Sequence, residues 1–379
     1  MTSQKNWFEA NPKKTLASVI IVGFLIIDFS LAAALKILGI FEPSYVTSSV
    51  REAHYRIADP VFHHGLKKNI SNYTAEWGKI DYRVDTNSLG FKDSEANQVS
   101  LSTHNKRIVL IGDSFTEGVG VEFNKTFAGR LKQYFKRQNI DVLNAAATSY
   151  SPIIYYRKIK YLIETVGLKF NSLIVFIDLS DIEDDALGYT FDKDENVISQ
   201  GAAANRGAHE TAKADGNKKP LSVKEFFTQY TYFLGRLRNL SAYLKVKTRA
   251  WDGGLNKRRA MWTLDDKLYN DFAKKGLAAS AGYMTRLKSL LDANNIDLTI
   301  AVYPWPDQIF NQDKQSKQLT YWQNWASENN VAFIDLFSLF IPADSPEITI
   351  RQYYINGDVH WNAAGHKVIF KQVIKQINP

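Results

Sequence analysis

The sequence contains no cysteine among its 379 residues. This absence excludes structural disulfides, thiolate metal ligands and a cysteine nucleophile, although it does not settle the compartment in which the protein works. We also find no internal repeat, and no Cys/His finger or aromatic RNA-binding segment that would indicate a nucleic-acid partner. His63 and His64 have no acidic partner at metal-ligand spacing and are interpreted as a surface or packing pair. We predict neither a metal nor an organic cofactor.

The composition bounds the class of protein. Hydrophobic residues make up 45% of the chain and aromatic residues 13%, which is enough to bury one large core, alone or with a smaller appendage. The formal net charge is +8 and the sequence pI is about 9.2. A solvated basic surface is the favoured interpretation of this charge, and attraction to anionic lipid or acidic glycans is the alternative.

One long hydrophobic run stands near the N-terminus. Residues 15–35 read TLASVIIVGFLIIDFSLAAAL, which is long enough to cross a hydrocarbon layer of about 30 Å as a helix. Lys5, Lys13 and Lys14 precede it, and cytoplasmic flanks are typically rich in such residues. We therefore predict a cytoplasmic tail at 1–14, a single membrane-spanning anchor at 15–41 of the inner cell membrane, and a periplasmic or extracellular domain beyond it.

Two alternatives remain for this run, a cleavable signal peptide ending near 32–34 and a buried helix of a soluble core. An uncleaved anchor is favoured because the run exceeds the roughly 7 to 15 apolar residues of a signal peptide. Asp28 lies within it, and a charged acid at mid-membrane depth costs about 2.5 to 3.5 kcal/mol on insertion scales. Asp28 therefore indicates either a membrane partner or a protonated acid that a marginal anchor tolerates.

Beyond the anchor, a polar segment at 42–105 is interpreted as a linker with a small N-terminal flap, and a domain at 106–379 follows. Its predicted strands are 107–111, 141–143, 172–177, 298–303 and 332–336, and its predicted helices are 127–137, 154–166, 265–294 and 363–377. Strands that alternate with helices predict an α/β domain with a doubly wound parallel sheet.

A helical insertion at 196–262 interrupts this alternation. It begins with a low-complexity loop at 196–219 and continues into an aromatic and basic amphipathic stretch at 221–247. Packing of this stretch as a lid on the core is favoured, and docking on a membrane surface is the alternative.

The residues that indicate chemistry lie at the two ends of the domain. Ser114 occurs in Gly112-Asp113-Ser114-Phe115, directly after the predicted strand 107–111, and Asp358 and His360 stand two residues apart far downstream. On an extended backbone, two such side chains project from the same side. A serine nucleophile needs a base and a third group that orients the base. We predict that Ser114 is the nucleophile, His360 the base and Asp358 the orienting acid, with Asp113 holding the turn.

These blocks resemble those of the SGNH hydrolases, also called the GDSL esterase family. The Gly-Asp-Ser block near the first strand and the Asp-x-His block near the C-terminus carry the resemblance, which spans about 108–374. Segment 84–93 is similar to the stretch that precedes the serine block in membrane-anchored members. The resemblance implies the SGNH hydrolase fold, with a flavodoxin-like sheet, and an acyl-enzyme on Ser114.

The resemblance also implies an oxyanion hole built from Ser114, Ala146 and Ser180. Here the chain departs from the family pattern, which has glycine where Ala146 stands and asparagine where Ser180 stands. Three further residues follow predicted strands and are predicted to bind substrate: Asn144, Asp181 and Trp305. The acids at 178–185 are interpreted as solvated, with cation or sugar binding as the alternative.

Together these features predict a membrane-anchored serine O-acyl esterase or O-acyltransferase that acts on envelope or extracellular polysaccharide. The resemblance implies a polytopic membrane O-acyltransferase as a partner, and the helix that carries Asp28 is its predicted contact, beside membrane lipid. Two alternatives are kept. One is a catalytically weak or inactive glycan-binding or assembly subunit, which the departures at Ala146 and Ser180 motivate, and the other is a lipid esterase.

Overall fold

The computed structural model describes residues 6–37, 55–78, 80–200, 231–233, 257–341 and 345–377. Its contacts divide the chain into two units, one formed by 1–50 with 217–249 and the other by 51–216 with 250–379. Most of the predicted insertion at 196–262, including all of its aromatic stretch except 231–233, lies outside the described residues. The same is true of 38–54.

The first unit contains the apolar N-terminal helix. Helix α1 (Trp7–Ala10) is followed by α2 (Pro12–Ile37), and α2 is long and apolar enough to cross a membrane, a test that a signal sequence also passes. Its apolar side chains are largely exposed, whereas Asp28 is fully buried. The Asp28 carboxylate accepts the backbone N–H groups of Tyr232 at 2.7 Å and Phe233 at 2.6 Å.

The ring of Phe233 also contacts the ring of Phe24, with centroids 6.3 Å apart. The Asp28 carboxylate therefore accepts hydrogen bonds from the backbone of the protein itself. Contact between Asp28 and a membrane acyltransferase stays a prediction.

The second unit begins with the N-terminal flap, whose strands form two small antiparallel sheets. Strands β1 (Arg56–Asp59) and β2 (His63–Leu66) form a hairpin. Strands β3 (Tyr73–Trp77), β4 (Ile80–Thr86) and β5 (Lys92–Asp93) form a three-stranded sheet. The Lys92 ammonium donates to the carbonyls of Gly118 at 2.6 Å and Val121 at 2.9 Å, so the flap is bound to the main domain.

A parallel sheet of five strands forms the centre of this unit. The strands are β6 (Arg107–Ile111), β7 (Asp141–Asn144), β8 (Ser172–Ile177), β11 (Asp297–Val302) and β12 (Ala332–Asp335). Their spatial order is β12-β11-β8-β6-β7, which is the flavodoxin-like order with a switch point between β6 and β8. The prediction of a flavodoxin-like, doubly wound sheet is confirmed.

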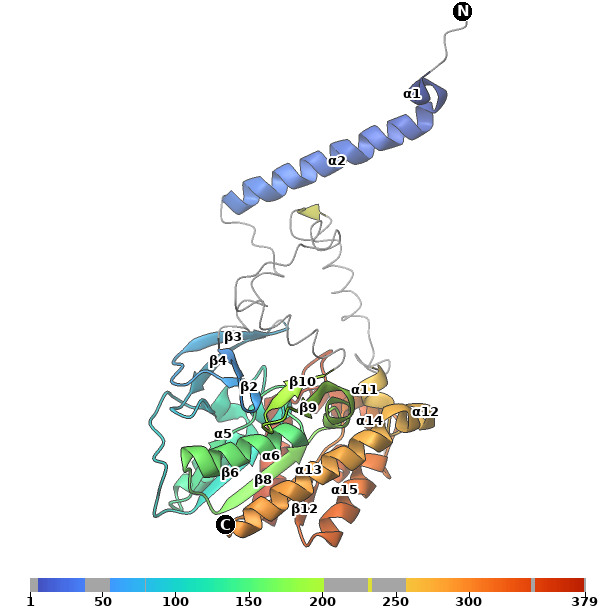
Figure 1. The fold of residues 1–379 in the computed structure, drawn as a ribbon. Helices are drawn as coiled ribbons and strands as arrows, with labels where there is room; N and C mark the ends of the chain where they lie inside the picture. Colours follow the sequence, from blue (N-terminus) through green and yellow to red (C-terminus); the bar gives the residue numbers. More distant parts are fainter. Residues whose placement is uncertain are drawn as a thin grey trace, which may run out of the picture. The chain divides into compact units, whose positions relative to one another are not determined.

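Helices pack against the sheet in two groups, because right-handed crossovers cover opposite faces when the chain moves in opposite directions from the switch point. Helix α5 (Phe127–Lys136) contacts α18 (Ala363–Gln376), and α6 (Pro152–Tyr161) contacts α13 (Lys274–Ala293). Figure 1 shows α6 and α13 lying side by side. Helix α15 (Lys317–Glu328) contacts β11 and β12.

The remaining described elements are short. They are α4 (Ser114–Glu117), η1 (Phe123–Lys125), η2 (Leu162–Val166), α7 (Asp181–Glu183), η3 (Asp184–Gly188), β9 (Tyr189–Phe191), β10 (Val197–Ser199), α11 (Lys257–Met261), α12 (Asp266–Leu268), η4 (Tyr269–Ala273), α14 (Pro306–Phe310), α16 (Phe337–Phe340) and α17 (Pro346–Tyr353). The predicted helix at 265–294 is thus three segments, with a π-helical turn at η4 before α13.

Candidate active site

The serine lies on a tight turn between a buried strand and a one-turn helix. All five residues of β6 are buried, and α4 begins at Ser114 directly after Gly112 and Asp113. The Asp113 carboxylate accepts the backbone N–H of Phe115 at 3.0 Å, which caps the helix and confirms the predicted turn-holding role. A Cβ on Gly112 would lie 2.2 Å from Thr116 Oγ1, so this turn requires glycine.

The acid and the imidazole are presented by a second turn, between α17 and α18. The backbone N–H of Asp358 donates to the carbonyl of Ile355 at 3.0 Å, and Ile355 donates to the carbonyl of His360 at 2.8 Å. Gly357 within the turn has φ +74°, a conformation that glycine adopts without strain. The expectation of an extended backbone at 358–360 is therefore wrong, because a closed turn brings the two side chains together.

Ser114, His360 and Asp358 meet as a hydrogen-bonded triad. Ser114 Oγ lies 2.7 Å from His360 Nε2, and His360 Nδ1 lies 2.5 Å from Asp358 Oδ1. A carboxylate only accepts, so Nδ1 carries the proton of the neutral ring and Nε2 accepts from the serine hydroxyl. Ser114 and His360 are each 7% exposed. This is the arrangement in which an imidazole takes the hydroxyl proton as the oxygen attacks.

A tryptophan of the flap completes the surroundings of the acid. The indole N–H of Trp77 donates to Asp358 Oδ2 at 2.9 Å. Burial by itself would raise the pKa of Asp358, but its hydrogen bonds and charge interaction with His360, helped by Trp77, hold that pKa below the usual range. The acid therefore stays ionised beside the imidazole. Trp77 belongs to no motif that the sequence offered.

The predicted oxyanion residues lie at the carboxyl ends of neighbouring strands. The Ala146 N–H, in the loop after β7, donates to the side-chain oxygen of Asn144 at 3.3 Å. Ser180 follows β8 and is buried, and its N–H donates to Asp178 Oδ1 at 2.7 Å. The Ala146 bond is longer than the usual range for an N–H donor. The oxyanion roles of Ala146 and Ser180 stay predictions.

The residues predicted to bind substrate lie inside the protein. Asn144 donates to the carbonyl of Thr116 at 2.8 Å, Asp181 accepts the hydroxyl of Tyr155 at 2.8 Å, and Trp305 donates its indole N–H to an aspartate at 2.7 Å. All three predicted residues are buried. These bonds hold the three side chains in place beneath the site, and their direct contact with substrate stays a prediction.

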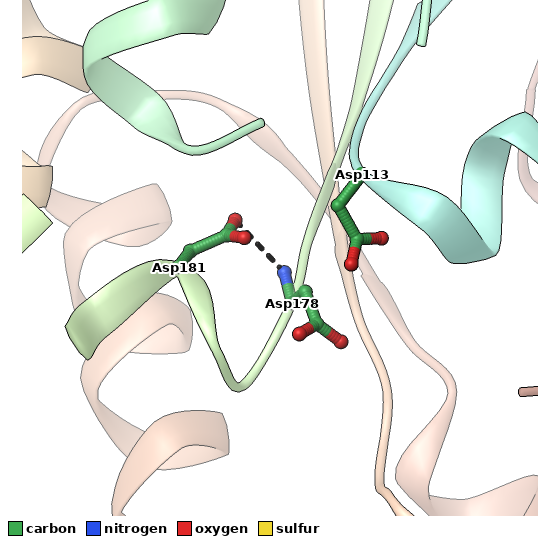
Figure 2. Close-up of side chains that lie close together, drawn as sticks. All are labelled: Asp113, Asp178 and Asp181. Carbon is green, nitrogen blue, oxygen red and sulfur yellow. Dashed lines mark hydrogen bonds between the residues drawn. The ribbon is translucent and has the colours of Figure 1, made fainter. Parts of the chain in front are cut away.

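Three buried carboxyl groups lie together beneath the nucleophile. Figure 2 shows Asp113, Asp178 and Asp181, whose ligand atoms lie within 4.8 Å of one another. Burial, and then the charge of Asp178, raises the pKa of both Asp113 and Asp181 well above the usual range. Protonated carboxyl groups carry no charge, so they can lie this close together without repulsion. The same three groups are the ones that could bind a cation.

The other acids of this loop serve the fold. Arg259 forms ion pairs with Glu183 and Asp184, and Asp185 accepts the hydroxyls of Ser151 at 2.6 Å and Ser280 at 2.7 Å. The interpretation of these acids as solvated is wrong. Their partners come from segments distant in sequence, which the local pattern of acids could not reveal.

The remaining histidines of interest also have partners within the protein. His366 is buried in α18 and accepts the backbone N–H of Phe127 at 3.3 Å. His63 and His64 bond to each other through Nδ1 atoms 2.7 Å apart, and His64 Nε2 reaches the carbonyl of Thr148 at 2.7 Å. These contacts agree with packing roles.

A scan of protein-family models and a search of curated proteins find no match. Among solved structures, the chain is similar to a GDSL-like lipase from Bacteroides thetaiotaomicron, with 12% identity over 73% of this chain and 90% of that chain and a TM-score of 0.36. It is similar to a member of the lipolytic G-D-S-L family from Veillonella parvula, with 13% identity over 71% of this chain and 97% of that chain and a TM-score of 0.36.

A third similarity is to a catalytic mutant of an acetylxylan esterase from Geobacillus stearothermophilus, with 11% identity over 74% of this chain and 97% of that chain and a TM-score of 0.39. Identities and TM-scores of this size decide neither family nor substrate, so the function is inferred from the geometry of the triad.

Proposed function

We propose that this protein is a serine esterase or O-acyltransferase that forms an acyl-enzyme on Ser114. The observation that carries the proposal is the continuous set of hydrogen bonds from Ser114 Oγ through His360 to Asp358, at 2.7 and 2.5 Å. Such a set both activates the hydroxyl and fixes the tautomer of the base.

The reaction follows from these positions. His360 Nε2 takes the hydroxyl proton while Ser114 Oγ bonds to the carbonyl carbon of an ester, and the oxyanion forms beside the Ser114 N–H. When the intermediate collapses, the bond to the leaving oxygen breaks and that oxygen receives the proton from His360. Water or a sugar hydroxyl then attacks the acyl group by the same steps in reverse order. Asp358 balances the charge of the imidazolium in both halves.

The finer proposal is that the acyl group is carried by envelope or extracellular polysaccharide, and that α2 anchors the protein in the inner cell membrane. Support comes from the apolar length of α2 and from the resemblance of segment 84–93 to membrane-anchored members of the family. A polytopic membrane acyltransferase is the proposed partner, since it would deliver acyl groups to an outward-facing serine.

A glycan-binding or assembly subunit with little activity is the second candidate. It is favoured by one observation, namely that the Ala146 N–H bonds to Asn144 Oδ1 at 3.3 Å and so is not wholly free for an oxyanion. Loss of one such donor typically costs about 10² to 10³ in rate.

Ester hydrolysis separates the two candidates. The purified full chain is assayed with p-nitrophenyl acetate and with acetylated xylan oligomers, beside Ser114→Ala and the control Ser100→Ala, whose serine is exposed. The proposal predicts activity in the wild type and in Ser100→Ala, and loss of at least 10³-fold in Ser114→Ala, as for removal of a triad nucleophile. Binding of the oligomers without hydrolysis by the wild type would favour the second candidate.

Acetyl transfer to an unacetylated oligomer distinguishes a transferase from an esterase.

A further inference from the structure

Trp77 contacts two members of the triad although it belongs to the N-terminal flap. Its indole N–H donates to Asp358 Oδ2 at 2.9 Å. Its ring meets the ring of His360 edge to face, with centroids 4.9 Å apart and an interplanar angle of 86°. The tryptophan and the acid are separated by 281 positions in the sequence.

The hydrogen bond from Trp77 holds the Asp358 carboxylate at Oδ2, the oxygen that His360 does not contact. Asp358 Oδ1 accepts from His360 Nδ1 at 2.5 Å and from the His360 backbone N–H at 2.9 Å. Trp77 occupies Oδ2. A carboxylate held at both oxygens cannot rotate away, so Oδ1 remains in line with the ring nitrogen. The indole ring also packs against the imidazole, as does Phe115 with centroids 4.6 Å apart.

The loop after the nucleophile helix is shaped to admit this indole. Gly120 has φ +71°, and a Cβ there would lie 2.9 Å from Ile355 Cδ1 and 3.4 Å from Trp77 Cδ1. The flap that carries Trp77 is itself bound to the same loop, because Lys92 donates to the carbonyls of Gly118 and Val121. Trp77 is therefore held in place from its own strand and from the main domain.

We infer that Trp77 is a positioning residue of the active site, which holds the Asp358 carboxylate and, through it, the His360 imidazole in the orientation that accepts the Ser114 proton. This inference rests on the proposed function, because it assigns a role to Trp77 in that same reaction. It also makes the flap part of the active site, so the segment before 106 is more than a spacer between the anchor and the domain.

The test substitutes Trp77→Phe in the full chain, which keeps an aromatic ring and removes the N–H. The second-order rate of Ser114 labelling by a fluorophosphonate, and kcat and KM for p-nitrophenyl acetate, are measured from pH 5 to 9. We expect both rates to fall by about 10- to 100-fold, the loss that is typical when a group that orients a metal-ligating histidine is removed. The loss should be in kcat, with KM nearly unchanged.

The pH profile separates positioning from a purely structural role. A carboxylate that has lost a donor attracts the imidazolium proton more strongly, so the acid limb of the rate should move to higher pH in Trp77→Phe. The control is Trp325→Phe. Trp325 is buried, whereas Trp77 is half-buried, and the Trp325 indole N–H donates to Thr285 Oγ1 at 3.4 Å, away from the triad. Trp77→Leu serves as a second variant if Trp77→Phe does not fold.

The outcomes are distinct. A slower Trp77→Phe enzyme with a shifted acid limb, beside an unaffected Trp325→Phe, supports the inference. Wild-type rates in Trp77→Phe, a loss of rate with an unshifted acid limb, or an equal loss in Trp325→Phe overturns it while the proposed function stands. A wild type that neither hydrolyses the ester nor reacts with the fluorophosphonate overturns the proposed function and this inference together.

Discussion

Arg56 and Glu117 form an ion pair with two hydrogen bonds, at 2.7 and 2.8 Å, that joins the first strand of the flap to the last residue of the nucleophile helix. The Glu117 side chain is fully buried. The same carboxylate accepts the backbone N–H of Thr148 at 2.7 Å, in the loop that contains Ala146. One acid thus holds together the flap, the helix that begins at Ser114 and the loop of the predicted oxyanion donor.

Replacing Arg56 by Met should destabilise the protein strongly. The substitution leaves the Glu117 carboxylate buried without its cation, and breaking a buried pair in this way typically costs about 3 to 5 kcal/mol. Denaturant unfolding of the detergent-solubilised chain measures the change. Lys125→Met is the matched control, since Lys125 and Glu122 form an exposed pair at 2.8 Å, and pairs of this kind contribute about 0 to 1 kcal/mol. Equal effects of the two substitutions would contradict the assignment.

The same pair predicts a dependence on pH. Burial raises the pKa of Glu117, but the charge and hydrogen bonds of Arg56 outweigh it and hold that pKa below its usual value. The unfolded state therefore binds the proton first as the pH falls. The stabilisation is present above the unfolded pKa and is lost as the pH falls through the folded pKa. Unfolding measured between pH 7 and 3 should show this loss in the wild type, and a smaller one in Arg56→Met.

Asp185 should make stability depend on pH in the opposite direction from Glu117. Burial raises its pKa to about 7, whereas an unfolded aspartate releases its proton near pH 4. Between these values the folded state binds the extra proton, so Asp185 makes stability fall as the pH rises through this window. In Asp185→Asn the thermal midpoint should fall less between pH 4 and 7 than in the wild type. Parallel curves for the two proteins would contradict the raised pKa.

Gly112 should not tolerate a methyl group. A Cβ there would lie 2.2 Å from Thr116 Oγ1 and 3.0 Å from the carbonyl of Phe176. Overpacking of this kind costs about 1 to 3 kcal/mol, and it should also displace the neighbouring Ser114 and slow ester hydrolysis. The control is Gly282→Ala in α13, where the new Cβ meets nothing within 4 Å and the helix should gain about 0.5 to 1 kcal/mol. Equal stabilities for the two variants would show that the turn is not tight.

The contact between α2 and residues 231–233 can be tested directly because the chain has no cysteine of its own. Phe24→Cys with Phe233→Cys should crosslink in membrane vesicles with a short bismaleimide, since the two rings lie 6.3 Å apart. Ile26→Cys with Phe233→Cys is the control, because Ile26 lies about 200° further round the helix. Adding Asp28→Leu should weaken the crosslink by removing the acceptor of the Tyr232 and Phe233 N–H groups. Equal crosslinking of both pairs would contradict the contact.

The parts of the fold that depend on local pattern could be predicted from the sequence. The apolar run at 107–111 predicts a buried strand, and the glycine after it predicts a turn. Both are found where they are expected. Ser114, Asp358 and His360 could be identified because each lies in a short block with its own chemistry. The closed turn at 355–360 could not, since an alternating pair of polar residues suits a strand equally well.

The features that the sequence did not reveal depend on contacts between distant segments. Trp77 lies in a polar flap, and nothing near it in the sequence indicates that its indole reaches Asp358. In the sequence, the acids at 178–185 look like a solvated loop. Only the fold shows that partners from distant segments, such as Arg259 and Ser280, bind them. Asn144 and Trp305 follow strands, a position that suits side chains that bind substrate as well as side chains that hold the loops beneath a site, and their contact with substrate stays a prediction.

The most direct test of the account is the location of a covalent adduct. The full chain is treated with a fluorophosphonate, digested, and its peptides are analysed by mass spectrometry, beside Ser114→Ala and His360→Ala. We expect one adduct, on the peptide that contains Ser114, absent in Ser114→Ala and formed far more slowly in His360→Ala. An unmodified wild type, or an adduct that persists when Ser114 is replaced, would contradict the account.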